Sequence, residues 1–277
     1  CQRDRTFTSS PNCEAPGCGS GTDSNTCTVI VTATANSQSD TNTITVTVTN
    51  VNDNSPTDMA LTAATAAENA AAGTDIGTLS TTDGDASGNS HVYTLVTDSG
   101  GATAYSGTDF ALDSAVLEVG SSPSFDYETT TSYTVYVKVA DGSNTAYVEG
   151  FTISITDVND QTPAVSVAST YSHAEATATT FQTYTITDSD TTGTYTCTLG
   201  GDDAADFTAS ISGKVCTVVW AAAPNYESPA DTGTNNVYDI TIAFSDGTND
   251  LAAQTTAVTV TDTDDQTPAV SGASTYS

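Results

Sequence analysis

Basic residues are almost absent from this sequence. In 277 residues, 34 Asp and Glu stand against four Lys and Arg, which gives a formal net charge of −30 at pH 7. So few cations cannot replace the counterions of a phosphate backbone, and this excludes nucleic acid as a partner. A charge of −30 also repels itself and weakens a compact fold unless salt or bound cations offset it. The acids that cluster at fixed places therefore raise the question of cation sites.

Long apolar runs and catalytic motifs are missing as well. No apolar stretch reaches the roughly 18 residues of a membrane-spanning helix, so we expect no membrane segment. The first residues, CQRDRTFTSS, do not resemble a secretion signal, and we expect an internal piece of a longer chain. The two histidines, His91 and His173, lie outside any GxSxG, HExxH or phosphate-loop motif. We therefore expect no enzyme.

The six cysteines indicate an oxidising, extracellular setting. Cys197 and Cys216 lie in β-like runs, and we expect a disulfide between neighbouring strands that closes a loop of about 20 residues and stabilises by about 3 kcal/mol. The other four crowd the Gly- and Ser-rich head of the chain, where three pairings exist: Cys1, Cys13, Cys18 and Cys27. Zinc is the alternative there, but a short CxxC spacing and a nearby His are missing, so disulfides are favoured.

Alternating apolar and polar residues predict strands throughout. The run TNTITVTVTN (41–50) predicts a half-buried antiparallel strand with Ile44, Val46 and Val48 on one face. Segments 132–142 and 151–158 predict a hairpin, and segments 237–247 and 255–265 predict a second one. Short strands separated by Gly, Asp, Asn and Ser turns are typical of an all-β sandwich fold.

The chain repeats itself with a period of about one small β domain. DVNDQTPAVSVASTYS begins at Asp157, DTDDQTPAVSGASTYS begins at Asp262, and the weaker NVNDNSP begins at Asn50. We expect four parts: a partial repeat with a Cys-rich insert over 1–56, full repeats over 57–163 and 164–268, and the start of another repeat over 269–277. Each of the three repeated segments contains a cluster of acids and amides, here called an acidic knot. A Pro closely follows each knot: Pro56, Pro163 and Pro268. Pro stiffens the linker, which suits domains held in line.

The acidic knots combine carboxylate, amide and main-chain oxygens with almost no nitrogen or sulfur donor, which is the ligand set of Ca²⁺. Any single knot is explained equally well as a turn, because DG, ND and DD are ordinary turn residues. The companions of the knots, however, recur in the same order in both full repeats. An early Glu is followed by a DxD pair, then DYE or NYE, then xDG, and last the acidic linker before Pro.

This order of motifs resembles tandem cadherin repeats over nearly all of residues 50–268. The resemblance implies seven-strand Greek-key sandwiches in a linear rod, with up to three Ca²⁺ at each junction. It implies that the following residues bind calcium at the central junction: Glu68, Asp126, Glu128, Asp157, Asn159, Asp160, Asp188, Asp190 and Asp246. These include eight carboxylates, and three Ca²⁺ would offset six of their charges.

The two outer junctions depart from the motif, and we expect fewer ions there. At the first, Asn50 replaces the opening Asp and Asn36 stands where the late Asp belongs, which leaves Asn52, Asp53, Asp83, Asp85 and Asp141. At the third, Asn225 replaces an Asp, and the ligands that remain are Glu175, Glu227, Asp262, Asp264 and Asp265.

The function that these expectations support is a calcium-stiffened extracellular rod with a structural or adhesive role. Its partners would be calcium and further repeats of the same or like chains. Trp220 lies mid-repeat and is expected in a core, so it does not mark an adhesive tip. The alternative is an O-glycosylated extracellular fibre or filament without a cell–cell adhesion role. Thr-rich outer faces would carry the O-glycans, although the β-propensity of Thr explains them equally well. The sequence contains no N-x-S/T sequon with a permitted middle residue.

Overall fold

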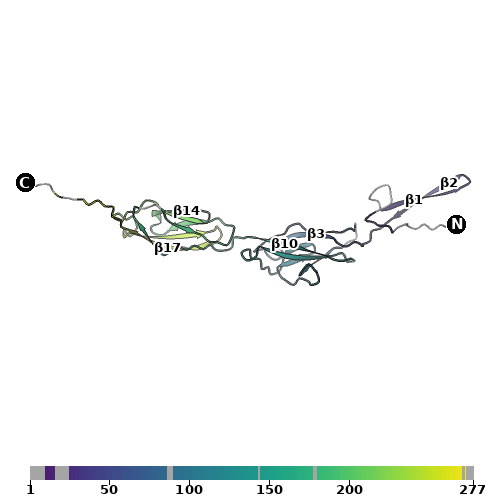
Figure 1. Cartoon of the computed structure of the whole chain (residues 1–277), viewed down its shortest axis with the longest axis horizontal. Coiled ribbons are helices and arrows are strands. Elements are labelled where there is room, and N and C mark those ends of the chain that lie inside the picture. The colour runs from purple at the N-terminus through teal and green to yellow at the C-terminus, as the bar shows by residue number, and fades with distance from the viewer. Residues whose placement is uncertain are drawn as a thin grey trace, which may run out of the picture. The chain divides into compact units, whose positions relative to one another are not determined.

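The computed structural model describes residues 10–15, 25–85, 90–142, 144–176, 180–269 and 272. The chain divides into two compact units, Cys1–Thr156 and Asp157–Ser277. Each unit contains one sandwich of two antiparallel-rich sheets, and the first unit also carries a separate hairpin (Figure 1). The all-β sandwich fold expected from the alternating sequence is confirmed.

The first unit begins with a two-stranded hairpin, β1 (Thr26–Ala35) and β2 (Gln38–Thr47). Its tight turn places Asn36 and Ser37 at φ 49° and 65°, a conformation that matches the twist of the two strands. The antiparallel strand predicted over 41–50 is present as β2, but its apolar face is buried only in part: Val46 and Val48 are partly buried, whereas Ile44 is 47% exposed. No described element of the chain covers either face of the hairpin with a second sheet, so alternation alone does not bury these side chains.

The first sandwich is formed by eight strand segments in two sheets. One sheet has the order β4–β10–β9–β6, and its members are β4 (Thr65–Ala67), β6 (Val92–Val96), β9 (Ser132–Ala140) and β10 (Tyr147–Thr156). The other has the order β3–β5–β8–β7, and its members are β3 (Asp58–Leu61), β5 (Asp75–Thr82), β7 (Phe110–Asp113) and β8 (Val116–Val119). The predicted β9–β10 hairpin is confirmed, and Val135, Val137 and Val139 of β9 are buried as their alternation indicates.

The second sandwich has seven strands and one short 3-10 helix. Its larger sheet has the order β11–β17–β16–β13, with β11 (Thr170–Ala174), β13 (Thr196–Gly200), β16 (Val237–Ser245) and β17 (Asp250–Thr261). Its smaller sheet has the order β12–β15–β14, with β12 (Thr180–Thr185), β14 (Phe207–Ser212) and β15 (Val215–Trp220), and helix η1 (Ala204–Asp206) precedes β14. The predicted β16–β17 hairpin is confirmed.

In each sandwich the last strand pairs in parallel with a strand near the start: β4, the second strand, in the first sandwich and β11, the first strand, in the second. β4 lies along β10, with Thr65 opposite Ser154, and β11 lies along β17, with Thr170 opposite Ala257. Because the two strands of each pair run in the same direction, the chain enters each sandwich at one end and leaves it at the opposite end. These ends are called the entry pole and the exit pole. The loops that follow β12 and β16 therefore share a pole with the segment that enters the sandwich.

The predicted disulfide between Cys197 and Cys216 is present, with the two Cα atoms 6.1 Å apart. It does not join neighbouring strands of one sheet as expected, because β13 and β15 belong to the two different sheets of the second sandwich. Both cysteines pack into the same core as Trp220, which is buried as predicted. The cross-link therefore ties one sheet of the sandwich to the other.

The Cys-rich head agrees only in part with the expectation that its four cysteines form disulfides. Cys27 is disulfide-bonded. Cys13 is a free thiol, and its sulfur accepts a hydrogen bond from Nδ2 of Asn25 at 2.8 Å. Cys1 and Cys18 lie outside the described residues. Within the described ranges, no helix is long and apolar enough to cross a membrane.

Candidate calcium-binding clusters

The entry pole of the second sandwich carries three carboxylates on two loops. Asp188 and Asp190 follow β12, and Asp246 follows β16 directly. One carboxylate oxygen from each residue lies within 4.8 Å of the others. Asp190 and Asp246 are buried, so their negative charges are brought together out of water, which is unfavourable without a compensating cation. We call Asp188, Asp190 and Asp246 the second entry cluster.

The linker segment Asp157–Gln161, here called the second linker, folds against this cluster within the second unit. Oδ2 of Asp157 accepts hydrogen bonds from the main-chain N–H of Thr191 at 2.7 Å and of Thr192 at 3.0 Å. The main-chain N–H of Gln161 donates to Oδ2 of Asp190 at 2.8 Å. Asn159 also lies here, and its Nδ2 donates to the main-chain oxygen of Asp246 at 3.3 Å. Asp160 is exposed at the outer side of the segment.

These contacts favour the ionised form of two of the acids. Burial raises the pKa of Asp246, but hydrogen bonds from the main-chain N–H of Asn249 and Thr248 outweigh burial and leave that pKa below its usual value. Burial likewise raises the pKa of Asp157, and hydrogen bonds from Thr191 and Thr192 reverse the effect, so that its pKa is also lowered. Oδ1 of Asp157 is buried and has no hydrogen-bond partner among the described residues, which leaves this oxygen available to a cation.

The entry pole of the first sandwich repeats this arrangement. The main-chain N–H of Asn54 donates to Oδ2 of Asp85 at 3.0 Å, as Gln161 does to Asp190. Nδ2 of Asn52 donates to the main-chain oxygen of Asp141 at 3.1 Å, as Asn159 does to Asp246. Asp83 differs from its counterpart Asp188, because its Oδ2 lies 3.2 Å from Nε2 of His91. Asn52–Asn54 is called the first linker below.

The sequence analysis missed three residues that the structure brings to these poles. A carboxylate oxygen of Glu14 lies within 4.8 Å of oxygens of Asp53 and Asp85. Glu14 was overlooked because it lies inside the Cys-rich insert, although it is the one Glu before Glu68. Asn144 and Asn249 each contact a linker, and their common signal is the spacing D-G-x-N, which occurs as DGSN and DGTN.

The exit pole of the first sandwich brings together three further predicted residues. Oxygens of Glu68, Asp126 and Glu128 lie within 4.8 Å of one another. Glu68 follows β4 and is buried, and its Oε2 accepts the main-chain N–H of Tyr127 at 2.7 Å. This bond places Glu68 between the two acids of the DYE motif. Asp126 accepts the N–H and hydroxyl of Thr129, at 3.1 and 2.8 Å, which fixes the turn after it.

The exit pole of the second sandwich has the same geometry. Oxygens of Glu175, Glu227 and Asp262 lie within 4.8 Å of one another. Glu175 accepts the main-chain N–H of Tyr226 at 2.6 Å and of Thr263 at 2.8 Å, and these bonds lower its pKa. A main-chain hydrogen bond lowers the pKa of Glu227, but burial and the neighbouring acids raise it further, and the net shift is upward. Such like-charge crowding is what a divalent cation relieves.

Three residues near this exit cluster are not part of it: two predicted ligands, Asp264 and Asp265, and Asn225, which stands where the motif has an Asp. Asp264 and Asp265 are exposed, and Asp265 accepts a hydrogen bond from Nε2 of Gln266 at 2.7 Å. Asn225, in place of an Asp, accepts the main-chain N–H of Ser228 at 2.9 Å. The substitution therefore keeps the turn while removing one negative charge from the pole.

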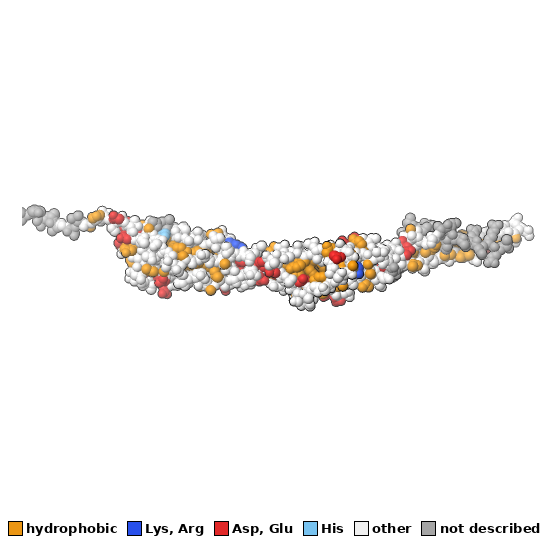
Figure 2. Space-filling view, turned by 60° about the horizontal axis from the view of Figure 1, so that its bottom comes forward, with side chains coloured by type: hydrophobic (Ala, Val, Ile, Leu, Met, Phe, Trp, Pro, Cys, Tyr) orange, Lys and Arg blue, Asp and Glu red, His pale blue; other side chains and the backbone are white. Residues whose placement is uncertain are grey.

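The nine residues predicted for the central junction fall into two groups, one in each unit. Glu68, Asp126 and Glu128 belong to the first unit, and the second linker and second entry cluster belong to the second. The described lysines do not neutralise either group. Nζ of Lys214 donates to the main-chain oxygen of Asp188 at 2.9 Å, and Nζ of Lys138 donates to that of Gly101 at 3.3 Å. On the face drawn in Figure 2, acidic side chains gather in small groups and basic ones are few.

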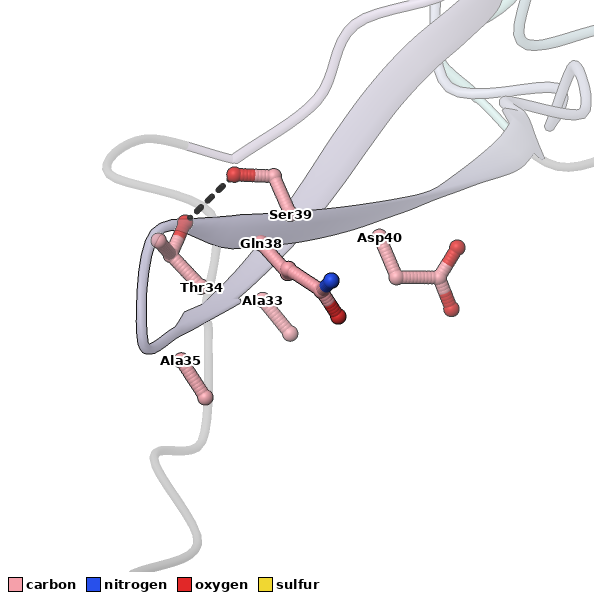
Figure 3. A pocket seen from close by; sticks show the side chains of 6 residues that line it. All are labelled: Ala33, Thr34, Ala35, Gln38, Ser39 and Asp40. Atoms are coloured by element: carbon pink, nitrogen blue, oxygen red, sulfur yellow. Dashed lines mark hydrogen bonds between the residues drawn. The ribbon is translucent and has the colours of Figure 1, made fainter.

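The oxygen donors at these poles fit calcium. Each pole offers carboxylates, and each entry pole adds amide and main-chain oxygens, which is the mixed oxygen set that Ca²⁺ takes at coordination numbers of six to eight. A different surface hollow, at the turn of the β1–β2 hairpin, does not offer such a set of several carboxylates (Figure 3). It is lined by small and polar side chains with the single carboxylate of Asp40.

Comparison with known proteins supports the fold. No family model matches the chain, and no curated protein matches it. The ectodomain of human desmocollin-1 is 17% identical with a TM-score of 0.66, and the match covers 87% of this chain and 49% of that one. Protocadherin gamma B7 domains EC3-6, described as a cis-dimer, are 20% identical with a TM-score of 0.55, covering 87% and 59%. Mouse cadherin-23 EC22-24 is 22% identical with a TM-score of 0.50, covering 86% and 74%.

The chain thus spans about half the length of the desmocollin and protocadherin structures that it matches. At such identities the likeness concerns the fold and leaves the sites to be argued from the residues themselves. The sandwich topology, the parallel pairing of β4 with β10 and of β11 with β17, and these structural matches show that the described sandwiches have a cadherin-like repeat fold.

Proposed function

We propose that this chain is part of an extracellular, calcium-binding array of cadherin-like repeats that serves as a structural or adhesive rod. One observation carries the proposal. Both sandwiches present closely spaced carboxylates at both poles, and at each entry pole a linker is hydrogen-bonded to the same loops. An enzyme would need a nucleophile or an acid–base pair in a cleft, whereas these acids are distributed at the ends of repeats.

Calcium would act between repeats. The exit cluster of the first sandwich and the second entry cluster belong to units that are joined covalently at Thr156 and Asp157. We propose that cations bound by Glu68, Asp126 and Glu128 are shared with the second linker and with the second entry cluster. The first linker, with Asp53, Asp83, Asp85 and Asp141, would hold fewer ions, and Glu14 would supply a carboxylate there. The second exit pole would bind through Glu175, Glu227, Asp262, Asp264 and Asp265.

The physical result of binding is a locked linker. Without metal, eight carboxylates at the central junction repel one another, and the two units are free to swing. Each bound Ca²⁺, up to three at this junction, offsets two of those charges, and ligands from both units are tied to common ions. The array would then be extended and stiff, as a rod that bears load or presents an adhesive surface requires.

A calcium titration of residues 1–277 by small-angle X-ray scattering, starting from EDTA, tests the proposal. We expect the maximum dimension to lengthen and its spread to narrow, with a half-effect between micromolar and millimolar calcium. Isothermal titration calorimetry counts the ions. Asp188→Asn should weaken binding by at least about tenfold, because a ligand carboxylate is lost without a change of shape. Asp113→Asn, the same change at an exposed strand end, is the matched control.

A scattering profile that is identical in EDTA and in millimolar calcium, together with no binding heat, would rule the proposal out. In that case the acids are solvated turn residues, and the fold alone is established. A loss of affinity in Asp113→Asn equal to that in Asp188→Asn would show that general charge, and no defined site, attracts the calcium.

The alternative of an O-glycosylated fibre rests on the exposed Thr residues. Thr41, Thr43 and Thr45 on β2 are exposed, as is Thr32 on β1. Glycans there would cover an otherwise open hairpin and protect its edges. Intact-mass measurement of the protein from its natural source, before and after O-deglycosylation, tests this alternative, and an unshifted mass would contradict it.

A further inference from the structure

The side-chain amide of Asn249 lies where several oxygen atoms converge. Its Nδ2 is 3.0 Å from the main-chain oxygen of Gln161, 3.2 Å from Oδ1 of Asn159 and 3.2 Å from Oδ2 of Asp246. A fourth oxygen, the main-chain oxygen of Asn159, lies at 3.5 Å. The second linker supplies three of the four oxygens, and the loop after β16 supplies the other. A single nitrogen atom therefore joins the linker to this loop.

Asn144 occupies the same position in the first sandwich. Its Nδ2 lies 2.6 Å from the main-chain oxygen of Asn54, 2.6 Å from Oδ1 of Asn52 and 2.8 Å from Oδ2 of Asp141. The three oxygens are of the same kinds as in the second sandwich: one main-chain, one amide and one carboxylate oxygen. Two separate parts of the sequence therefore build the same arrangement.

The D-G-x-N loop explains how the asparagine reaches this place. Gly142 and Gly247 adopt φ angles of 89° and 99°, which turn the chain sharply after each Asp. The main-chain N–H of Asn249 then donates to Oδ1 of Asp246 at 2.6 Å, and that of Asn144 donates to Oδ1 of Asp141 at 2.8 Å. The loop thus directs the side chain back over its own Asp and toward the linker.

The oxygen atoms around this –NH₂ group form a site that would also suit a cation. An –NH₂ group has two hydrogens, so it cannot give a full hydrogen bond to each of three or four oxygens. Rotating the amide by half a turn would bring its Oδ1 against the same oxygens, which is repulsive unless a cation lies between them. In the orientation found, the partial positive charge of the –NH₂ group faces the oxygens. This orientation is the one that binds the linker without metal.

We propose that Asn144 and Asn249 act as built-in substitutes for a cation, each fastening its linker to the sandwich that follows it in the chain. The linker would stay docked on that sandwich in the absence of calcium, and only the remaining oxygens of each entry pole would be left for metal. Asn144 and Asn249 are thus positioning residues that keep the metal ligands Asp141 and Asp246 facing the linker. The ion count rests on the proposed calcium function, whereas the docked linker does not.

Hydrogen exchange in EDTA tests the metal-free part on the whole chain. The main-chain amide of Gln161 reports docking, because it donates to Asp190. In the unaltered chain we expect this amide to be protected, and Asn249→Ala should speed its exchange about tenfold, since several hydrogen bonds to the linker are lost. Gln254→Ala is the control, because the side chain of Gln254 donates to the nearby main-chain oxygen of Ala252 and lies on β17, away from the linker. It should leave the exchange unchanged.

Two results of that experiment would overturn the inference. One is a Gln161 amide that already exchanges at the rate of an unstructured chain in EDTA. The other is unchanged protection in an Asn249→Ala variant whose β17 amides show that the second sandwich is folded. Neither result depends on calcium binding, so a failure of the proposed function would be recognised separately by the scattering and calorimetric titrations.

A second variant tests the cation-like role. Asn249→Asp keeps the shape but replaces the donor by a carboxylate, so we expect faster Gln161 exchange in EDTA and its recovery on adding calcium. Calorimetry should then count one more Ca²⁺ for the variant than for the unaltered chain. The side-chain amide resonances of Asn249, followed by NMR in the unaltered chain, should stay protected when calcium is added. Their displacement by calcium, or an unchanged ion count in Asn249→Asp, would contradict the inference.

Discussion

The two sandwiches have similar residues at their poles but different residues in their cores. In the first, an aromatic group of Phe110, Phe125 and Tyr133 has ring centroids 5.2–6.1 Å apart, and no disulfide links its described residues. In the second, Trp220 lies 4.1 Å from Phe207 and 4.9 Å from Tyr238 by ring centroids, and a disulfide joins the sheets. Two linker contacts at the entry poles, by contrast, correspond between the sandwiches: Asn52 and Asn159 donate to the main-chain oxygens of Asp141 and Asp246, and the N–H groups of Asn54 and Gln161 donate to Asp85 and Asp190.

This difference follows from the nature of the interactions. Burial of apolar surface is non-directional, so many combinations of side chains fill a sandwich of the same shape. Hydrogen bonds and metal ligation require particular atoms at particular distances, so few residue types serve at the poles. The function we propose therefore depends on the part of each repeat that is most restricted chemically.

The largest effect is expected from the aromatic centre of the second sandwich. Trp220→Ala removes a side chain that is 3% exposed and should destabilise that sandwich by about 4 kcal/mol. Amides of β16 should lose exchange protection, while amides of β9 in the first sandwich keep theirs. Phe125→Ala is the matched change in the first sandwich and should give the reverse pattern. Equal loss in both sandwiches from either variant would show that the two units do not unfold independently.

The disulfide should contribute the next largest effect. Replacing Cys197 and Cys216 together by Ser opens a loop whose ends are 19 residues apart and should cost about 3 kcal/mol. Denaturant unfolding followed by Trp220 fluorescence reports the second sandwich alone, because the chain contains one Trp. The first sandwich, read from its β9 amides, should be unaffected. An unchanged unfolding midpoint of the second sandwich would contradict this prediction.

A smaller effect that depends on pH is expected at Asp203. Burial raises the pKa of this carboxylate, but the main-chain N–H groups of Thr232 and Asp239, each donating at 2.7 Å, outweigh it and lower that pKa. A lowered pKa in the folded state stabilises the protein above the unfolded pKa of about 3.9, and this contribution is lost as the pH falls through the folded value. Asp203→Asn should therefore cost about 2 kcal/mol at pH 7.

Urea unfolding of the Asp203→Asn variant and of the unaltered chain at pH 7, 5 and 3 checks the sign. The difference in free energy of unfolding between the two proteins should be largest at pH 7, nearly as large at pH 5 and smaller at pH 3. A gap that is constant over this range would show that the loss comes from packing and not from the ionised carboxylate.

The smallest expected effect distinguishes the two described lysines. Lys214 donates to the main-chain oxygens of Asp188 and Asp190, at 2.9 and 3.3 Å, and so supports the loop that carries the second entry cluster. Lys138 donates to Gly101, away from any cluster. Lys214→Met should cost about 1 kcal/mol and speed exchange in residues 187–192. Lys138→Met should leave the corresponding loop of the first sandwich unchanged, and equal effects in both loops would contradict the distinction.

The sequence predicted those features that depend on local order. Alternation identified the β9–β10 and β16–β17 hairpins, and the order of the acidic motifs named the acids that lie together at both exit poles and at the second entry pole. Alternation did not show that Ile44 would be exposed, because burial depends on a second sheet that faces the hairpin. It also did not show that Cys197 and Cys216 lie on different sheets, since two β-like runs carry no information about which sheet each one joins.

The asparagines of the D-G-x-N loops were missed for a related reason. Asn144 and Asn52 are 92 positions apart, and their contact exists only after the whole sandwich has formed. An asparagine after Asp-Gly is also a common turn residue, so nothing in one repeat singles it out. The recurrence of D-G-x-N at the same place in both repeats was the available signal.

The parallel pairing of β11 with β17, and of β4 with β10, has a mechanical consequence. When the two ends of a sandwich are pulled apart, β11 and β17 are drawn in opposite directions along their length. The hydrogen bonds over Thr170–Ala174 and Ala257–Thr261 then share the load in shear and must fail together. Strands peeled from an end would instead lose these bonds one at a time. Each repeat is therefore arranged to resist tension along the chain.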